Sequence, residues 1–198
     1  MLIGLTGGIA SGKSKISLFL KSQGAVIIDA DEIARHVVEP LSCAWKKIVD
    51  LWGKDILRSD QSLDRQKLAS IVFSNKDELE KLNNITHPEI IREIKERISL
   101  EPAGSLIILD APLLIESGLF SIVDYVWLVS VTEVTQIKRL VERDGLSTEE
   151  AQKRISVQMP LEEKKKYAHV IIDNNGQWED TENFIRHSLL MKGGQVLY

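Results

Sequence analysis

A glycine-rich segment near the start of the chain has the residue types and spacing of a phosphate-binding loop. Residues 7–14 read Gly-Gly-Ile-Ala-Ser-Gly-Lys-Ser and match the pattern G-x-x-x-x-G-K-[ST]. Glycines allow consecutive backbone N–H groups to point at one anion, because no Cβ stands in the way. Lys13 would contact the β- and γ-phosphates of a nucleoside triphosphate, and the hydroxyl of Ser14 would ligate Mg²⁺. The residues expected to hold the nucleotide here are Gly8, Ala10, Ser11, Gly12, Lys13, Ser14 and Lys15.

Two elements position this loop. Residues 2–6 form a short apolar run typical of a buried strand, and residues 14–22 predict a helix with Ile16, Phe19 and Leu20 on one face. The first turn of that helix adds unpaired N–H groups and a partial positive charge at the loop. Strand, loop and helix in this order favour a phosphate site over a chance glycine turn.

Two aspartates, Asp29 and Asp31, follow the second apolar run. In an open α/β sheet, ligands collect at the carboxyl ends of the strands, so these carboxylates are predicted to lie near the γ-phosphate. A carboxylate there can accept the proton of an attacking hydroxyl or hold Mg²⁺. The alternative is a cap for a helix over residues 32–38. One of the pair can cap while the other acts, and we expect Asp31 to be the catalytic one.

A third aspartate, Asp110, ends the apolar run 106–109. An apolar run that ends in aspartate has the form of a Walker B element, which holds Mg²⁺ directly or through water. The residues that follow, Ala111 to Leu114, would either form an apolar ledge for a flexible organic substrate or pack in the core.

Three arginines, Arg139, Arg143 and Arg154, lie in a highly charged stretch between the last two apolar runs. One of them, on a closing lid, would neutralise charge on a transferring phosphoryl group. Arginines on a solvated helix have the same pattern, so periodicity does not choose among the three. In the same stretch, Ser147 and Glu150 have the spacing of a capping box and predict the start of a new helix.

Isoleucines at helical spacing predict a helix over residues 88–98, with Pro88 at its start. His87 would then be a cap or a surface residue, and the alternative is a residue that binds the phosphoryl acceptor.

Five short apolar runs, rich in Ile, Val and Leu, do not alternate with polar residues. They are residues 2–6, 25–28, 106–109, 125–129 and 170–172. Continuous apolar runs are typical of strands covered on both faces, and helical stretches separate these runs. The pattern predicts a three-layer α/β fold, in which helices flank a five-stranded parallel sheet.

Two intervals between these runs are too long for simple crossovers. We interpret them as an acceptor-binding helical insertion and a mobile lid, because phosphoryl-transfer enzymes exclude water when they close. The alternative is that these helices have no role in binding the acceptor or in closing the site. In one single domain, the core would be 1–30, 104–138 and 168–198, the insertion about 31–103 and the lid about 139–167.

Composition limits the class of protein. The chain has 198 residues, of which 43% are hydrophobic and 27% charged, which is typical of one folded domain. Its net charge of −4 argues against a nucleic-acid partner, and no apolar run is long enough to span a membrane. The single cysteine, Cys43, fits a reducing cytoplasm and is expected to be a small buried residue. We take a monomer as the default.

Two segments resemble motifs of signalling GTPases but stand in the wrong places. Asp173 to Gly176 match D-x-x-G but follow the last apolar run, far from the loop. Asn75 to Glu78 resemble N-K-x-D but have Glu78 in place of the aspartate. A nucleotide-dependent switch or adaptor is therefore disfavoured.

Several segments, in one order, resemble the dephospho-CoA kinase family over about residues 1–190. They are Thr6 to Ser14, Ile28 to Asp31 with Ala34 and Arg35, Leu63 to Arg65 with Val72 and Phe73, His87 with Pro88, Pro112 to Leu114 with Glu116, Gln136 with Arg139, Arg154 with Gln158, and Ile172 to Gly176. The resemblance implies a P-loop kinase fold. It also implies phosphorylation of the ribose 3′-hydroxyl of dephospho-CoA by ATP, with Mg²⁺, in the last step of coenzyme A synthesis.

The resemblance also implies residue roles. Lys13 would hold the donor phosphates, Asp31 would receive the hydroxyl proton, and Arg139 would stabilise charge during transfer. Asn174 would contact the nucleotide. The residues implied for the acceptor site are Asp31, Arg35, Arg65, His87, Pro112, Leu113 and Leu114.

Two positions depart from the family pattern, with Lys15 where threonine is common and His169 where aspartate is common. Neither is needed for the chemistry, although Lys15 could alter nucleotide affinity. Another small-molecule kinase of the same fold stays the main alternative.

Overall fold

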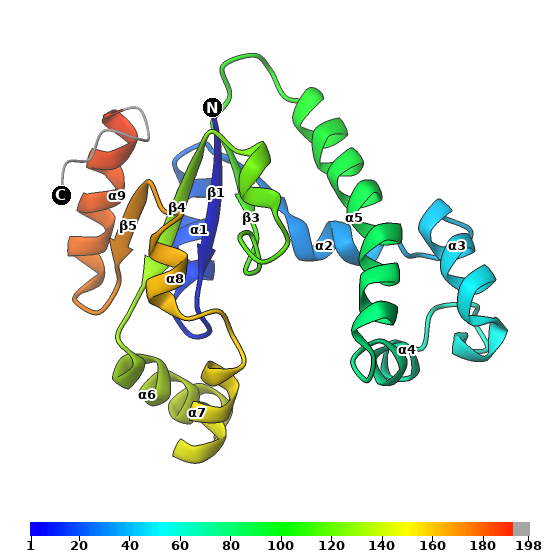
Figure 1. The fold of residues 1–198 in the computed structure, drawn as a ribbon. Coiled ribbons are helices and arrows are strands. Elements are labelled where there is room, and N and C mark those ends of the chain that lie inside the picture. Colours follow the sequence, from blue (N-terminus) through cyan, green and yellow to red (C-terminus); the bar gives the residue numbers. More distant parts are fainter. Residues whose placement is uncertain (192–198) are drawn as a thin grey trace. The chain divides into compact units, whose positions relative to one another are not determined.

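The computed structural model of the protein describes residues 1–191 and divides into two compact units (Figure 1). The first unit contains Met1–Ile28 and the chain from Ala103 onward, and the second contains Asp29–Pro102. Each unit has its own buried apolar cluster.

A five-stranded parallel sheet forms the centre of the first unit. Its strands are β1 (Leu2–Gly7), β2 (Val26–Asp29), β3 (Ile107–Asp110), β4 (Tyr125–Ser130) and β5 (Val170–Asp173). They lie in the order β2-β3-β1-β4-β5. Each strand coincides with one of the apolar runs, because strands covered on both faces carry apolar residues at successive positions. The predicted α/β fold is confirmed.

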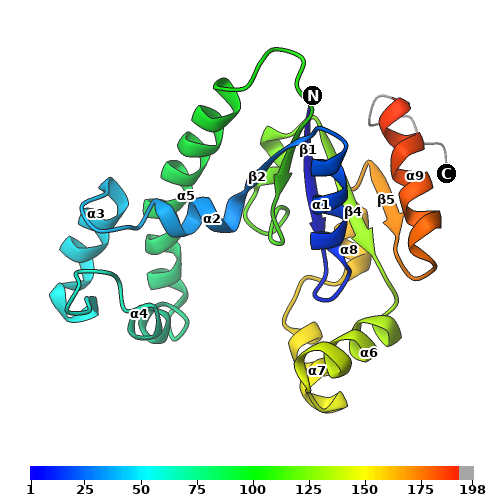
Figure 2. The ribbon, with the colours of Figure 1, turned by 180° about the vertical axis from the view of Figure 1, so that it is seen from behind.

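Helices cover both faces of this sheet (Figures 1 and 2). Helix α1 (Lys13–Ser22) lies on one face and α8 (Leu161–Lys165) on the other, while α9 (Trp178–Leu190) packs against β5. One buried cluster joins the strands to α1 and α9. Its members include Ile3, Leu5, Ile16, Leu20, Trp127, Val129, Ile172 and Ile185. This packing fixes the end of β1 and the start of α1, and so the two ends of the glycine-rich loop.

Between β4 and α8, the chain forms α6 (Glu133–Asp144) and α7 (Thr148–Ser156), which pack against each other. The capping box predicted at the start of α7 is present. The Ser147 hydroxyl accepts from the N–H of Glu150 at 3.2 Å, and the Glu150 carboxylate accepts from the N–H of Ser147 at 2.8 Å. A short 3₁₀ helix, η2 (Leu119–Ile122), follows β3.

In the second unit, the described helices are α2 (Ala30–His36), α3 (Cys43–Trp52), η1 (Lys54–Ile56), α4 (Arg65–Val72) and α5 (Lys76–Ser99). Helix α5 contacts α2, α3 and α4. The buried cluster of this unit consists of Ile48, Ile56, Leu63, Leu68 and Val72.

The helix start predicted at Pro88 is wrong. Helix α5 begins at Lys76, is capped by Asn75 and continues through Pro88 to Ser99. Proline lacks an N–H and disturbs one turn, but packing on either side holds the helix together. Leu82, before the proline, packs against the buried cluster of the unit, and Ile94, after it, is fully buried. His87 is therefore a half-buried residue inside a helix rather than a cap.

The expectation for Cys43 is also wrong, because this residue is exposed. It is the first residue of α3, capped by the Ser42 hydroxyl, and it is the neighbouring Ala44 that enters the core. A helix buries only one face, and the sequence around Cys43 does not fix where that face begins.

A charged cluster joins α2 to α5. Nδ1 of His36 lies 2.8 Å from Oε1 of Glu93, and Arg97 donates to Glu93 at 2.8 Å and to Glu32 at 3.2 Å. The hydrogen bond and the charge of Glu93 raise the pKa of His36 above its usual value. Burial works to raise the pKa of Glu93, but its hydrogen bonds from His36 and Arg97 prevail and lower it.

Candidate active site

The glycine-rich loop leaves β1 and enters α1 in an unusual backbone conformation. Ala10 has a φ of 58° and Gly12 a φ of 90°, both in the left-handed region. Gly12 is the N-cap residue of α1, so no side chain of its own covers the first N–H groups of the helix. Gly7 leaves room for the hydroxyl of Ser11, because a Cβ at Gly7 would lie 2.6 Å from that oxygen. The result is a helix N-terminus suited to an anion.

Lys13 and Asp110 meet at the end of the loop. The ammonium of Lys13 donates to the carboxylate of Asp110, and both side chains are mostly buried. Asp110 ends β3 and is paired in register with Leu5 of β1, two residues before the end of that strand. The sheet register thus brings together the lysine and the aspartate that the sequence had singled out separately.

Arg139 of α6 is the arginine that reaches the loop. Its guanidinium donates to the carbonyl oxygens of Ala10 at 3.2 Å, Ser11 at 3.1 Å and Asn174 at 2.8 Å. The buried Asn174 follows β5, and its side-chain amide donates to the carbonyl of Ser11 at 2.7 Å. Arg139 and Asn174 therefore hold one side of the loop from two different elements.

The other two candidate arginines do not reach the loop. Arg143 forms an ion pair with Asp144 at 2.7 Å, and Arg154 lies 3.7 Å from the same carboxylate. Both side chains are more than half exposed. Of the three, Arg139 is the one that contacts the loop in this structure.

Two glutamines hold the other side of the loop. The N–H of Ile9 donates to Oε1 of Gln158 at 2.8 Å, and Nε2 of Gln136 donates to the carbonyl of Ile9 at 2.8 Å. Gln136 lies in the first turn of α6, and Gln158 follows α7. The sequence interpretation gave these residues no role of their own.

A cavity of about 510 Å³ opens beside the loop. Its lining residues are Ala10, Gly12, Lys15, Arg139, Glu142, Arg143, Asn174, Gly176 and Trp178. The ammonium of Lys15 lies 4.0 Å from the centroid of the Trp178 ring, a cation–π contact at the wall of the cavity. The edge of Trp178 packs against Phe19, with 5.7 Å between ring centroids. Sequence reasoning missed Trp178, although it lies only two residues after the D-x-x-G segment.

The loop after β3 is tied to the sheet and to α8. The carbonyl of Pro112 accepts from the Thr6 hydroxyl at 3.1 Å and from the ammonium of Lys164 at 3.3 Å. Lys164 is almost fully buried and forms an ion pair with Glu116 at 2.7 Å. Leu114 is also fully buried, against Gly4, so its side chain packs in the core. Leu113 is 53% exposed, so its side chain is open to solvent.

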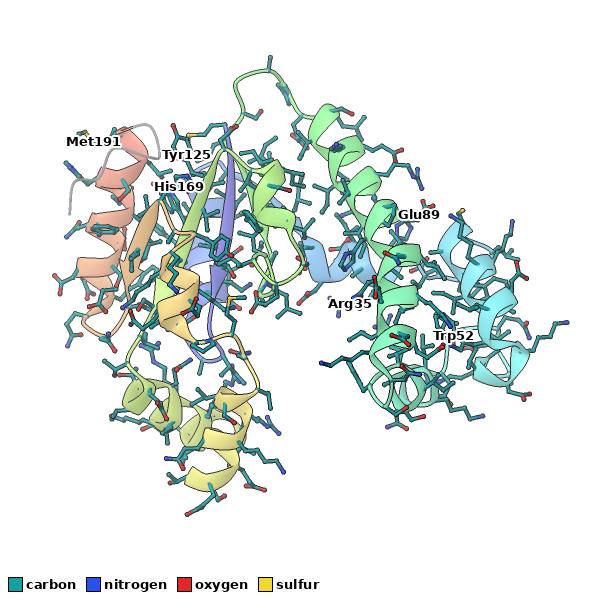
Figure 3. The ribbon with its side chains drawn as sticks, viewed as in Figure 1. Arg35, Trp52, Glu89, Tyr125, His169 and Met191 are labelled. Carbon is teal, nitrogen blue, oxygen red and sulfur yellow. The ribbon has the colours of Figure 1, made fainter. Side chains whose placement is uncertain are left out.

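The remaining predicted site residues belong to the second unit. Asp29 is the N-cap of α2 and accepts from the N–H groups of Asp31 and Glu32 at 2.8 and 3.0 Å, so it is the capping member of the aspartate pair. Asp31 is exposed in the first turn of α2, where the side chain of Arg35 donates to its carbonyl at 3.0 Å. Figure 3 labels Arg35 on this helix. Arg65 is exposed at the start of α4.

The oxygen donors at the loop fit Mg²⁺. Within residues 1–191, no group of three or more His, Cys, Asp or Glu side chains could hold a metal ion. The loop region supplies the exposed Ser14 residue at the start of α1 and the carboxylate of Asp110. Mg²⁺ prefers such hard oxygen ligands and is usually bound by one or two protein groups together with substrate phosphates.

Comparison with known proteins identifies the family. The family model described as Dephospho-CoA kinase matches residues 1–180, which is most of the chain. The chain belongs to the dephospho-CoA kinase family.

Relatives of known name agree with this assignment. A dephospho-CoA kinase of Carboxydothermus hydrogenoformans is 50% identical over 186 residues, which cover 93% of this chain and 90% of the relative. Among solved structures, a protein of Thermus thermophilus has a TM-score of 0.82 and 34% identity, covering 96% of this chain and 97% of its own. The dephospho-CoA kinase of Campylobacter jejuni has a TM-score of 0.72 and 30% identity, and the match covers 97% of this chain and 96% of the relative.

The two departures from the dephospho-CoA kinase pattern have different surroundings. His169 lies outside the loop region and joins two strands, since its Nδ1 accepts from the N–H of Val126 at 3.0 Å. Its ring packs edge-on against Tyr125, and Figure 3 shows these two residues together. Lys15, in contrast, lines the cavity beside the loop. Of the two, only Lys15 is placed to affect a ligand there.

Proposed function

We propose that this chain transfers the γ-phosphoryl group of ATP to the 3′-hydroxyl of the ribose of dephospho-CoA, giving ADP and coenzyme A. The family match over residues 1–180 carries this proposal. The paired Lys13 and Asp110, in a complete phosphate-loop sequence, support it from the geometry.

The donor binds at the loop. Its phosphates lie against the N-terminus of α1, and the charge of Lys13 faces the β- and γ-phosphates. The rest of the nucleotide occupies the cavity lined by Lys15, Arg139 and Asn174. Two arginines and a lysine at this cavity supply the positive charge that a nucleotide requires, although the whole chain has a net charge of −4.

Mg²⁺ accompanies ATP in this proposal. The hydroxyl of Ser14 would hold it, and Asp110 is the nearby carboxylate. When bound, the ion neutralises charge on the β- and γ-phosphate oxygens. The pairing of Asp110 with Lys13 keeps both groups at the phosphate end of the sheet.

The transfer step needs alignment and charge stabilisation rather than a covalent intermediate. The acceptor 3′-oxygen forms a bond to the γ-phosphorus as the bond to the β,γ-bridging oxygen breaks, and the hydroxyl proton passes to the carboxylate of Asp31. Arg139, held at the loop by three carbonyl groups, stabilises the developing charge.

The acceptor site is assigned to the residues that the resemblance to the family implies. Arg35, Arg65 and His87 are assigned to the charged parts of dephospho-CoA, since arginine pairs well with phosphate. Pro112 and Leu113 are assigned to its organic part. Leu114 supports this loop from the core, as its complete burial indicates.

The segment over about 139–167 acts as a lid in this proposal. Its tip, between α6 and α7, contains Gly145, which ends α6 with a left-handed φ of 66°. Closure over bound ATP would exclude water from the reaction. In the described residues, no helix is both long and apolar enough to cross a bilayer. A cytoplasmic location and a monomeric state stay predictions of the sequence.

One assay tests the function. Release of ADP from ATP is coupled to a reporter reaction and compared for dephospho-CoA, shikimate, gluconate and a nucleoside, with Mg²⁺ present. We expect turnover with dephospho-CoA only, and mass spectrometry should find a product heavier by one phosphoryl group. Turnover with another acceptor alone would favour a different small-molecule kinase. Tight nucleotide binding without turnover of any acceptor would favour a nucleotide-dependent switch.

A further inference from the structure

The phosphate loop holds an alanine in a backbone conformation that alanine rarely adopts. Ala10 has a φ of 58°, where its Cβ crowds the following carbonyl oxygen. A residue keeps such a conformation only where its surroundings determine it. The contacts on either side of Ala10 therefore decide whether the loop has its shape before a nucleotide arrives.

Both polar groups of the preceding residue are held from outside the loop. Ile9 donates its N–H to Gln158 and accepts at its carbonyl from Gln136, each at 2.8 Å. An N–H can only donate and a carbonyl can only accept, so the two glutamines contribute opposite ends of their amides. We call Gln136 and Gln158 the glutamine clamp.

The clamp packs closely on the loop. A Cβ at Gly8 would lie 2.7 Å from Nε2 of Gln136 and 3.8 Å from Oε1 of Gln158, so both amides lie over this glycine. Gly8 is not a fixed position of the G-x-x-x-x-G-K-[ST] pattern. Its lack of a side chain is explained by the clamp. The two glutamines also line a small cavity of about 50 Å³ together with Ser11 and Lys164.

The clamp comes from both ends of the α6–α7 helical pair. Gln136 precedes the tip of this pair and Gln158 follows it, while the tip itself lies at Gly145 to Ser147. Most of the helical pair lies in the segment of about 139–167 that is proposed above as the lid, and Gln136 lies just before that segment. A movement of the pair as a whole would remove both hydrogen bonds from Ile9.

We propose that Gln136 and Gln158 are positioning residues that hold the Ile9 peptide, and with it the strained turn at Ala10, in the shape that receives the donor phosphates. This inference rests on the proposed role of the loop in binding ATP. It adds a direct link between the α6–α7 pair and the geometry of the phosphate site.

The opposite roles of the two amides give a matched test. Gln158→Glu keeps an oxygen that accepts from the Ile9 N–H, whereas Gln136→Glu removes the amide that donates to the Ile9 carbonyl. Both variants add one negative charge beside the loop, so each controls for the charge of the other. Gln158→Met removes the acceptor without adding charge and keeps nearly the same side-chain length.

The first readout is hydrogen exchange of the Ile9 amide, measured by NMR on the full chain without nucleotide. We expect Gln158→Met to speed this exchange on the order of tenfold or more, and Gln158→Glu to leave it near the wild-type rate. The amide of Leu5, in the buried strand β1, controls for the fold. Unchanged exchange at Ile9 in Gln158→Met would overturn the clamp, whatever reaction the enzyme catalyses.

The second readout is the dissociation constant of ADP, measured by calorimetry. Gln136→Glu should bind ADP about tenfold more weakly than Gln158→Glu, a ratio that corresponds to about 1.4 kcal/mol. Equal dissociation constants for the two glutamate variants would overturn the positioning role. Because ADP binding needs no acceptor, these results are independent of whether dephospho-CoA is the substrate.

Discussion

Lys13 of the phosphate loop is ion-paired with Asp110, the last residue of β3. Only 16% of the lysine side chain and 12% of the aspartate side chain are exposed. A pair this well buried is not a mobile surface contact, and the removal of one partner leaves the other charge poorly solvated. The pair keeps the ammonium at the end of the sheet, where the donor phosphates are proposed to bind.

Lys13→Ala should abolish most activity, because it removes a charge-assisted contact to the transferring phosphoryl group. We expect kcat to fall on the order of a hundredfold or more, with the circular dichroism spectrum unchanged. Lys21→Ala, at the exposed end of α1, is the matched control and should keep normal turnover. A folded Lys13→Ala enzyme with normal kcat would show that the loop lysine does not act on the transition state.

Asp31→Asn should lower kcat far more than it changes the KM for ATP, because asparagine has the size of aspartate but does not accept the hydroxyl proton. The control is Asp29→Asn. Asp29 acts as the N-cap of α2, and asparagine caps about as well as aspartate, so this variant should be mildly affected. If steady-state kinetics show equal losses in the two variants, Asp31 has no special part in proton transfer.

Arg139→Ala should reduce kcat by about tenfold to a hundredfold, because it removes a charge and three hydrogen bonds that hold the loop and Asn174. Arg139→Lys should recover little, since an ammonium cannot reproduce the planar fork of donors. Arg154→Ala is the control, because Arg154 lies in α7 and its side chain is more than half exposed. Similar kcat values for the alanine variants of Arg139 and Arg154 would contradict the assignment.

Lys15→Thr should weaken ADP binding about two- to fivefold, because it removes one cation from the cavity wall. It should also change the fluorescence of Trp178, whose ring lies 4.0 Å from the ammonium. Trp178→Phe identifies the contribution of this tryptophan among the four in the chain. Titration with ADP would contradict the prediction if affinity and emission were the same in Lys15→Thr and the wild type.

The contact between His36 and Glu93 should make the second unit more stable in mild acid. The pKa of His36 is raised by Glu93, with a smaller contribution from Glu39, while Arg97 opposes it. A group whose pKa is higher in the folded state stabilises fully below its unfolded pKa of about 6.5. This contribution is lost as the pH rises through the folded value.

The contribution of His36 to stability can be measured as the free energy of unfolding in urea at about pH 6 and about pH 8. The loss of stability between the two pH values should be smaller in His36→Gln than in the wild type. The effect should be modest, because 56% of the His36 side chain is exposed. The other histidines are the same in both proteins, so the difference between the two proteins isolates His36. An identical pH dependence would show that the contact between His36 and Glu93 does not contribute to stability.

The sheet and the loop could be predicted from the sequence because their signals are local. Each buried parallel strand is a continuous apolar run, and the glycine pattern specifies a backbone that few other residues permit. The assignment of Asp29 as a cap also follows a local rule, since its carboxylate accepts from N–H groups two and three residues later.

The rest depended on contacts between distant parts of the chain. Periodicity did not choose among Arg139, Arg143 and Arg154. The family resemblance pointed to Arg139, and its contacts with loop carbonyls place it at the loop. Gln136 and Gln158 belong to the segments that resemble the family, but their residue pattern predicted no role, because a glutamine on a polar helix is usually solvated. At Pro88 the local rule failed, since apolar contacts before and after the proline hold α5 in one piece.

The buried Lys164 has a mechanical consequence for the α6–α7 pair. Its ammonium is fixed to the carboxylate of Glu116 and to the same Pro112 carbonyl that Thr6 binds. Withdrawal of α8 from the sheet would carry the ammonium away from both partners and leave the mostly buried carboxylate of Glu116 unpaired, at a cost of several kcal/mol. Helix α8 is therefore the fixed end of the stretch that runs from α6 to α8. Any swing of the two helices before it must pivot on the short link of residues 157–160.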